Sequence, residues 1–274
     1  MTMSWLTGVT RMREHGEAGV LVTVVDVHGH APRAAGAKMA VSSGSTWGSV
    51  GGGNLESVAV DRAREMVDAG DTQVRTVTFD LSDQASYQHG VQCCGGRVTV
   101  LLEPLPARPV VAVFGVGHVG LELARILARH DLRLHLVDSR PEQLDDARLA
   151  PLSDAEAVVE IHRVPVLPEL VLGGLPAGAR VLVMTHDHAE DYAVVDAALR
   201  TPGLGPIGLI GSSAKWARFR RRLLAEGGFD ESDLERVNTP IGLPGVEGKE
   251  PAVIAVSVAA ALLQDLRLVS GVAP

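Results

Sequence analysis

The chain of 274 residues carries a formal net charge of −8, and 46% of its residues are hydrophobic while only 3% are aromatic. The hydrophobic fraction is enough for packed cores, and the length suits one large domain or two ordinary ones. The negative charge argues against nucleic acid as a partner, since contacts to phosphates need clustered cations. No membrane segment is expected, because the most hydrophobic run, residues 251–263, is too short to span a bilayer and residues 1–16 lack an apolar signal core.

The N-terminal part of the chain predicts an α+β pattern of helices and strands. We expect one helix over residues 5–15 and a second that begins with Asn54 as its N-cap and ends near Gly70. Runs of β-branched and other apolar residues predict strands over residues 19–28, 39–42, 46–50, 74–81 and 97–103.

Three consecutive glycines, Gly51, Gly52 and Gly53, lead into the second helix. Unpaired N–H groups and the helix dipole point the same way at a helix N-terminus, so this segment is a candidate anion site. A tight turn without a ligand explains the same residues equally well. Arg33 and Lys38 in the preceding loop either add positive charge to such a pocket or are ordinary surface cations.

The only two cysteines, Cys93 and Cys94, are adjacent and lie between Gln92 and the pair Gly95-Gly96. Adjacent Cα atoms are about 3.8 Å apart, less than the roughly 4.4–6.8 Å that an ordinary disulfide needs. Two thiols also cannot complete a tetrahedral zinc site without other ligands. One alternative is a buried thiol that only packs. The polar Gln92 and the permissive glycines favour a functional site instead, and free thiols favour the reducing cytoplasm.

A proline-rich segment, residues 104–109, predicts a boundary between a domain of residues 1–105 and a domain of residues 106–274. Directly after it, an apolar strand runs into the pattern Gly115-x-Gly117-x-x-Gly120, and a helix is predicted from Leu121 to His130. This order of strand, glycine turn and helix is typical of a dinucleotide-binding unit.

Asp138 ends the next predicted strand and follows the last glycine of the turn by 18 residues. That is about the spacing of the carboxylate that binds a ribose in such folds. The fold prediction is therefore a Rossmann-like, doubly wound parallel sheet behind the α+β domain. A phosphate-bearing ligand is expected in its crevice, although such a unit can also serve as a scaffold.

The alternation of strands and helices continues to a final helix that Pro251 opens. His186, Asp187 and His188 follow a strand predicted over residues 180–184. Since strand ends face the ligand crevice in a doubly wound sheet, these residues are candidates for proton transfer, for ligand binding or for capping of the next helix. A metal is disfavoured there because no third ligand has a suitable spacing.

Gly211 and Ser212 follow another predicted strand, residues 207–210, and precede a helix. In this turn of small residues, Ser212 and Ser213 are candidate phosphate donors or simple helix caps. Lys215 begins a basic run that continues through Arg222. This run is either a solvated helix face or a surface that docks an anionic ligand or partner.

Several of these motifs occur together in one order along nearly the whole chain. Besides the glycine and cysteine motifs above, the set includes the motifs Ala31-Pro32-Arg33, Gly36-Ala37, Leu55-Glu56, Val137-Asp138-Ser139-Arg140, Thr185-His186-Asp187-His188, Thr239-Pro240-Ile241-Gly242 and Gly248-Lys249-Glu250-Pro251. In this combination the chain closely resembles the xanthine dehydrogenase accessory protein family of the XdhC/CoxI type. Its Gln-Cys-Cys-Gly-Gly motif resembles the form found in the xanthine dehydrogenase branch of that family rather than in the carbon monoxide dehydrogenase branch.

The resemblance implies a maturation factor with no turnover of its own. Such proteins bind the molybdenum cofactor, hold it while a cysteine desulfurase supplies its terminal sulfur, and help to insert it into apo xanthine dehydrogenase; many form dimers. Cys93 or Cys94 is then expected to ligate the thiophilic molybdenum. The cofactor-binding residues predicted from the motifs are Arg33, Gly51, Gly52, Gly53, Gln92, Cys93, Cys94, Gly95, Gly96, Gly115, Gly117, His118, Gly120, Asp138, His186, Asp187, His188, Gly211, Ser212 and Lys215.

The alternative function is an oxidoreductase that uses NAD or NADP on a small substrate. It is motivated by the glycine turn, by Asp138 and by the histidines at the strand ends. No Tyr-x-x-x-Lys or Ser-His-Asp set is visible to support it.

Overall fold

The computed structural model describes residues 4–81 and 96–270, and the chain divides into two compact units between Arg108 and Pro109. The first unit combines helices with an antiparallel sheet, and the second has helices on both faces of a parallel sheet. The predicted fold class, an α+β part followed by a Rossmann-like part, is confirmed.

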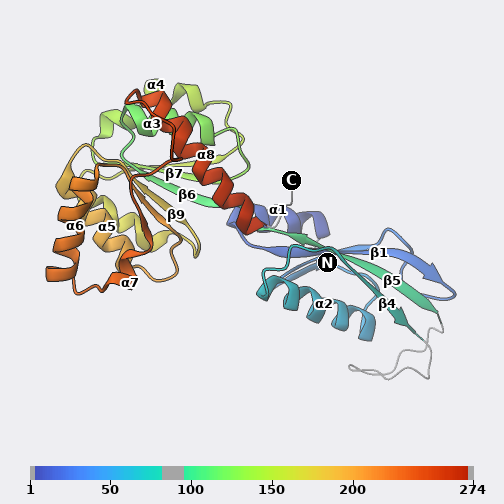
Figure 1. The fold of residues 1–274 in the computed structure, drawn as a ribbon. Coiled ribbons are helices and arrows are strands. Elements are labelled where there is room, and N and C mark those ends of the chain that lie inside the picture. Colours follow the sequence, from blue (N-terminus) through green and yellow to red (C-terminus); the bar gives the residue numbers. More distant parts are fainter. Residues whose placement is uncertain (1–3, 82–95, 271–274) are drawn as a thin grey trace. The chain divides into compact units, whose positions relative to one another are not determined.

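The first unit contains a five-stranded sheet in the order β3-β2-β1-β5-β4, with each strand antiparallel to its neighbours (Figure 1). Its helices lie on opposite faces of this sheet. The elements are α1 (Trp5–His15), β1 (Gly19–His28), β2 (Lys38–Ser42), β3 (Thr46–Gly48), α2 (Gly53–Asp68), β4 (Arg75–Asp80) and β5 (Arg97–Leu105).

Alternation along the strands divides the core of the first unit between the two helices. Met39 and Val41 pack in the cluster that α2 covers, while Ala40 between them packs with Met12 of α1. Successive side chains of a strand point to opposite faces, so one apolar strand serves both helices.

The glycine segment before α2 differs from the prediction. The helix begins at Gly53 with Gly52 as its N-cap, so the prediction of Asn54 as the cap is wrong. The φ angles of Gly51, Gly52 and Gly53 are 142°, 72° and 61°. Three consecutive positive φ values suit glycine and disfavour residues with a Cβ. The helix therefore begins with Gly52 as its cap, two residues before the predicted cap Asn54.

The linker between the two units also begins later along the chain than predicted. Strand β5 extends to Leu105, and Pro104 lies opposite Val20 of β1 in the ladder. The first residues of the predicted linker are therefore part of the sheet.

The second unit contains a six-stranded sheet in the order β11-β10-β9-β6-β7-β8, and all of its neighbouring strands are parallel. Its strands are β6 (Val110–Phe114), β7 (Arg133–Asp138), β8 (Val158–Arg163), β9 (Arg180–Val183), β10 (Ile207–Leu209) and β11 (Val237–Asn238). Its helices are α3 (His118–Leu127), α4 (Asp146–Leu149), α5 (His188–Arg200), α6 (Ser213–Glu226), α7 (Glu231–Leu234) and α8 (Pro251–Ser270), with 3₁₀ turns at Pro141–Leu144, Ala150–Leu152 and Pro168–Gly174.

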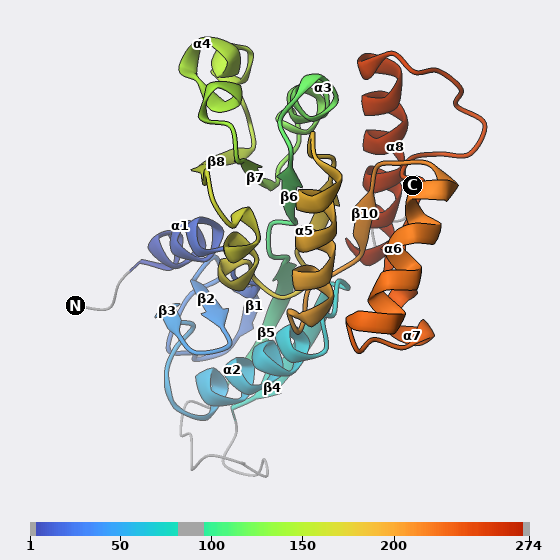
Figure 2. The same ribbon diagram turned by 90° about the vertical axis from the view of Figure 1, so that its left-hand side faces the viewer.

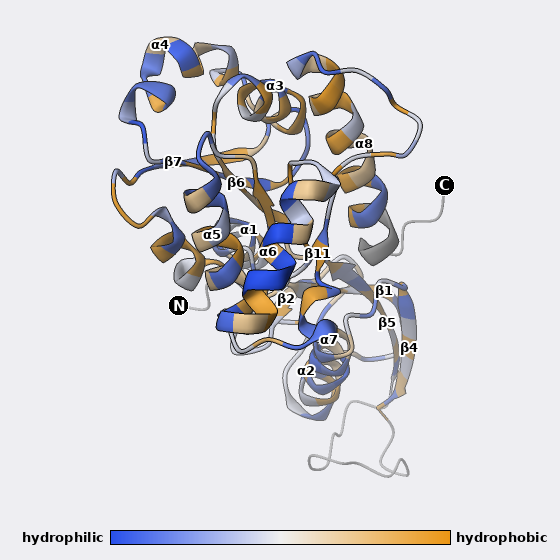
Figure 3. Ribbon diagram, turned by 60° about the vertical axis from the view of Figure 1, so that its left-hand side comes forward, coloured by the Kyte–Doolittle hydropathy of each residue, from blue (hydrophilic) through white to orange (hydrophobic). Residues whose placement is uncertain are grey.

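Helices α3 and α8 cover one face of this sheet and α5 and α6 cover the other (Figure 1; Figure 2). Figure 3 shows β6 as hydrophobic and much of α6 as hydrophilic, in keeping with the buried strand and the basic helix. The chain passes from β6 to β7 on one side and later from β9 outward on the other. The sheet therefore has its topological switch point between β6 and β9, where such folds bind their ligands.

Helix α3 begins at His118, three residues before the predicted start at Leu121, so that Gly120 belongs to the helix. In the described part of the chain, no helix combines the length and the apolar character that a bilayer crossing requires.

Candidate functional site

The glycine turn lies at the switch point, at the carboxyl end of β6. Gly115 has φ 97°, and a Cβ there would overlap the carbonyl of Met184 after β9. A Cβ on Gly120 would overlap the carbonyl of Gly115, so this glycine lets α3 pack against the turn. Both are required by the packing of the protein itself.

Gly117 is different, since a Cβ there would meet only Nη2 of Arg140, at 3.8 Å. The protein's own packing does not require a glycine at this position. In dinucleotide-binding turns, the second glycine lets the backbone approach a pyrophosphate. The exposed His118 follows it as the first residue of α3.

Asp138 lies at the end of β7 beside this turn, as predicted, but its carboxylate is already occupied. One oxygen accepts hydrogen bonds from the backbone N–H of Arg140 at 2.9 Å and from its Nε at 3.0 Å. The other accepts from the N–H of Val116 at 2.7 Å and from Nη2 of Arg140 at 3.0 Å. Four donors fill the four acceptor positions of a carboxylate, so a ribose hydroxyl would have to displace one of them. The hydrogen bonds between its guanidinium and Asp138 raise the pKa of Arg140.

A cleft of about 620 Å³ opens at the ends of β9 and β10 and brings together five of the predicted residues. They are His186, His188, Gly211, Ser212 and Lys215. Asp187 between the histidines caps α5, accepting a hydrogen bond from the N–H of Ala189 at 2.7 Å, which confirms the capping alternative. Ser212 likewise caps α6 through the N–H of Lys215.

Lys215 is not part of an exposed basic face. It is 6% exposed, forms an ion pair with Asp191 and donates to the carbonyl of Ile210 at 2.8 Å. Asp191 also accepts from the N–H of Thr185 at 2.9 Å and from its hydroxyl at 2.8 Å. A Cβ on Gly211 would lie 2.6 Å from Cδ of Lys215, so the stem of this lysine accounts for the glycine. The pair therefore joins the turn after β9 to the turn after β10.

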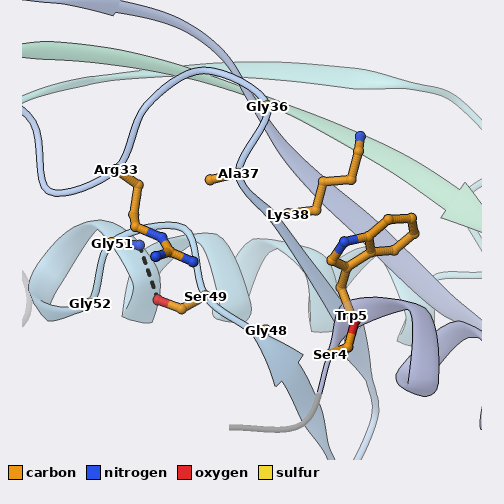
Figure 4. A pocket seen from close by; sticks show the side chains of 10 residues that line it. All are labelled: Ser4, Trp5, Arg33, Gly36, Ala37, Lys38, Gly48, Ser49, Gly51 and Gly52. Carbon is orange, nitrogen blue, oxygen red and sulfur yellow. Dashed lines mark hydrogen bonds between the residues drawn. The ribbon is translucent and has the colours of Figure 1, made fainter.

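Another cleft, of about 560 Å³, lies in the first unit and contains Arg33 with Gly51 and Gly52 (Figure 4). Figure 4 shows Arg33 extending over Gly51, with Trp5 and Lys38 together on the other side. The remaining lining residues are Ser4, Gly36, Ala37, Gly48 and Ser49.

Backbone amides in and directly before the triple-glycine segment bind a carboxylate from the chain itself. Oε2 of Glu56 accepts from the N–H groups of Val50 and Gly52, each at 3.1 Å, and from the hydroxyl of Ser49. The glycine turn is thus held closed by an acid one turn into α2, and these two amides are not open to an external anion.

The cysteine motif falls mostly outside the described residues: Gln92, Cys93, Cys94 and Gly95 lie in residues 82–95. Gly96 is described, and it is buried at the start of β5. A Cβ there would overlap the carbonyl of His30 and lie 2.8 Å from that of His28. Gly96 therefore allows a close backbone crossing at this end of the sheet.

Sequence reasoning missed a polar cluster on β7 and β8. His135 lies opposite Glu160 in the parallel ladder, and its Nδ1 is 2.9 Å from Nε2 of His162. The planes of the two rings differ by only 16°, and the ring centroids are 5.2 Å apart. This separation is about the sum of two ring radii and the distance between the two nitrogens, so the rings meet edge to edge in nearly one plane. Glu160 lies 3.7 Å from His135 Nδ1 and is held by Arg133 at 2.6 Å. The three donor atoms are close enough for a metal, but two nitrogens that face each other head-on suit a shared hydrogen better than a common ion.

The tautomer of this pair follows from burial. Nε2 of His135 is buried and has no hydrogen-bond partner among the described residues. A proton on that nitrogen would be an unsatisfied donor, so the proton is assigned to Nδ1, which donates to His162.

Stability is expected to fall in mild acid because of His135. Burial, and to a smaller extent His162 and Arg133, lowers its pKa, while Glu160 opposes the change. Below the ordinary histidine pKa of about 6.5, the unfolded chain takes up a proton that the folded chain does not, so unfolding becomes easier as the pH falls. Melting temperatures measured from pH 8 to pH 5 should fall more for the wild type than for His135→Asn. A His130→Asn variant should keep the wild-type slope, and equal slopes for all three proteins would contradict this account.

The chain is thus a two-part protein, in which an α+β unit with a cleft of its own precedes a Rossmann-type domain with a glycine turn at its switch point. Residues 12–80 match the XdhC and CoxI family, and residues 111–262 match the XdhC Rossmann domain. The chain belongs to the XdhC family, which confirms the resemblance seen in its motifs.

Relatives in Escherichia coli K12 align with most of the chain. The uncharacterized protein YqeB is 24% identical over 266 residues, which cover 96% of this chain but only 46% of YqeB. The molybdenum cofactor insertion chaperone PaoD is 26% identical over 263 residues, 83% of this chain and 77% of PaoD. This chain therefore spans less than half the length of one of these relatives.

Two solved structures are also similar. A crystal structure described as a xanthine dehydrogenase from Bacillus halodurans aligns with a TM-score of 0.48 and 20% identity over 97% of this chain and 96% of that one. The E. coli tRNA N6-threonylcarbamoyladenosine dehydratase TcdA aligns with a TM-score of 0.43 and 15% identity over 60% of this chain and 88% of that one.

Proposed function

We propose that this chain is a maturation protein for the molybdenum cofactor. It holds the cofactor as cargo, shields it while a cysteine desulfurase supplies the terminal sulfur, and helps to insert it into the molybdenum subunit of apo xanthine dehydrogenase. The observation that carries the proposal is the similarity to the insertion chaperone PaoD over most of both chains. Matches to both XdhC domains, in order, support it.

The chemistry of the cysteine pair is consistent with this cargo. Molybdenum in an oxo-sulfido centre prefers soft ligands, and Cys93 and Cys94 are the only thiols in the chain. We assign the metal end of the cargo to these two side chains. A cytoplasmic homodimer is part of the same proposal.

The residues of the second unit fit a phosphate-bearing molecule in part. The open approach to Gly117 suits the phosphate or pyrophosphate of a bound nucleotide. The occupied carboxylate of Asp138 weighs against the alternative of an oxidoreductase that uses NAD or NADP, because that acid would normally hold the ribose.

The proposal is tested on the full chain, produced in cells that make the molybdenum cofactor. The purified protein should carry molybdenum and pterin in equal amounts, measured by elemental analysis and by fluorescence of the oxidised pterin. Adding the loaded protein to apo xanthine dehydrogenase should raise its activity. A preparation that holds neither molybdenum nor pterin, and that fails to activate the apoenzyme, would rule the proposed function out.

A further inference from the structure

The cleft of the first unit has an unusual balance of charge for this protein. The chain has 33 acidic and 25 basic residues, yet none of the ten residues that line this cleft is acidic, while Arg33 and Lys38 are both cations. The carboxylate of Glu56, which lies close to the cleft, is engaged with Ser49 and with backbone N–H groups. The cleft therefore has a positive potential that the protein does not neutralise.

The two cations retain free hydrogen-bonding capacity. The structure gives the exposed Arg33 no hydrogen bond or ion pair with any residue of the described part of the chain. Lys38 donates to the hydroxyl of Thr23 at 2.8 Å, which uses one of the three N–H groups of its ammonium. Elsewhere in the same unit, arginines pair with carboxylates, as Arg97 does with Asp80. Unpaired cations inside a cleft are suited to an external anion, and a phosphate offers the oxygens that a guanidinium binds best.

An aromatic ring completes the cleft. Trp5 is half-buried, and its inner side packs on the core that α1 shares with the sheet. Nζ of Lys38 lies 5.8 Å from the centre of its ring. A fixed indole beside two cations is suited to a planar heterocycle that carries a phosphate, because stacking and charge-assisted hydrogen bonds then act on one molecule.

Local structure holds these groups in place. Gly48 has φ 84°, and a Cβ there would lie 2.5 Å from the carbonyl of Lys38 and 3.1 Å from Cβ of Trp5. Only glycine lets the end of β3 pass between the lysine and the tryptophan. Ser4 caps α1 beside them, so the positive end of this helix also faces the cleft. At about 560 Å³, the cleft is of a size that ordinary small-molecule ligands occupy.

We propose that the cations and the aromatic ring of this cleft, rather than the backbone amides of the triple-glycine turn, bind the phosphate and the fused heterocycle of the cargo. Arg33 and Lys38 hold the phosphate and Trp5 packs against the ring system. The inference rests on the proposed function for the identity of the cargo. It assigns the pterin-phosphate end of that molecule to residues of the first unit alone.

The binding test uses 6-hydroxymethylpterin phosphate as the probe, titrated into the full chain. Arg33→Gln should weaken binding about tenfold, the double variant with Lys38→Gln about a hundredfold, and Trp5→Leu about tenfold. Arg11→Gln removes one exposed charge from the same unit and should leave the affinity within about twofold of the wild type. Far-ultraviolet circular dichroism serves to check that each variant is folded. Arg33→Gln alters only an exposed loop residue.

Related probes distinguish a pterin-phosphate site from simpler ones. Unphosphorylated 6-hydroxymethylpterin and inorganic phosphate should each bind at least tenfold more weakly than the phosphorylated pterin, and AMP should bind more weakly as well. Equal affinity for AMP would overturn the pterin assignment. Wild-type affinity in the Arg33→Gln, Lys38→Gln double variant would overturn the site.

A second readout separates this inference from the proposed function. The cofactor content of the full chain purified from cells is compared between the wild type and the double variant. A loaded wild type and an equally loaded variant would overturn the cleft assignment but leave the function standing. A wild type that carries no cofactor but still binds the phosphorylated pterin through these residues would overturn the proposed function and leave the cleft assignment standing.

Discussion

Lys215→Met should destabilise the second unit by about 3–5 kcal/mol, because it leaves Asp191 as an unpaired buried charge. The exposed fractions of the two side chains are 7% for Lys215 and 1% for Asp191, so water cannot replace the lost partner. In a unit of this size, such a loss lowers the melting temperature by roughly 10 °C or more. Thermal unfolding followed by circular dichroism measures the change.

Two further variants identify the cause. Lys215→Met combined with Asp191→Asn should recover part of the loss, since an asparagine carbonyl can still accept from Thr185 and no buried charge remains. Arg125→Met breaks the exposed pair with Glu122 in the same unit and should cost less than about 1 kcal/mol. If Lys215→Met melted at the wild-type temperature, the buried pair would have no structural importance.

This pair also shows where sequence reasoning reached its limit. Lys215 belongs to a basic run and was predicted to bind the cofactor, but its partner Asp191 lies 24 residues away. The two meet only because β9 and β10 are neighbours whose following turns lie side by side. The pairing of strands decides this contact, and it joins residues that no short sequence pattern relates.

Local signals predicted much of what chain neighbours determine, although the cap of α2 is Gly52 and not Asn54. The glycine spacing, the strand before it and the acid after it predicted the Rossmann sheet and the place of Asp138. The caps Asp187 and Ser212 were also predictable, because a cap binds an N–H two or three residues ahead. The pattern could not indicate that Arg140, two residues further along the chain, would occupy Asp138.

Glu56 illustrates a motif whose meaning changed once side chains were placed. Gly51, Gly52 and Gly53 before a helix predict an anion site, and a carboxylate does bind there, but it comes from α2 itself. In the proposed site, an external anion is bound instead by Arg33, which comes from the loop between β1 and β2.

Replacing both Cys93 and Cys94 by serine should abolish cofactor transfer while leaving the fold intact. Serine has nearly the shape of cysteine but offers a hard oxygen that is protonated at neutral pH, so it does not replace a thiolate on molybdenum. We expect at least a tenfold fall in bound molybdenum and activation of apo xanthine dehydrogenase no better than buffer. Single variants should then show which thiol is required.

The phosphorylated pterin probe makes this prediction specific. If Arg33, Lys38 and Trp5 bind the pterin end independently of the metal end, the double serine variant should bind 6-hydroxymethylpterin phosphate as tightly as the wild type. Loss of both molybdenum and probe binding would mean that the cysteines support the cleft rather than the metal. Full molybdenum content and full activation by the double serine variant would remove the cysteines from the mechanism and leave the cleft as the only assigned contact to the cargo.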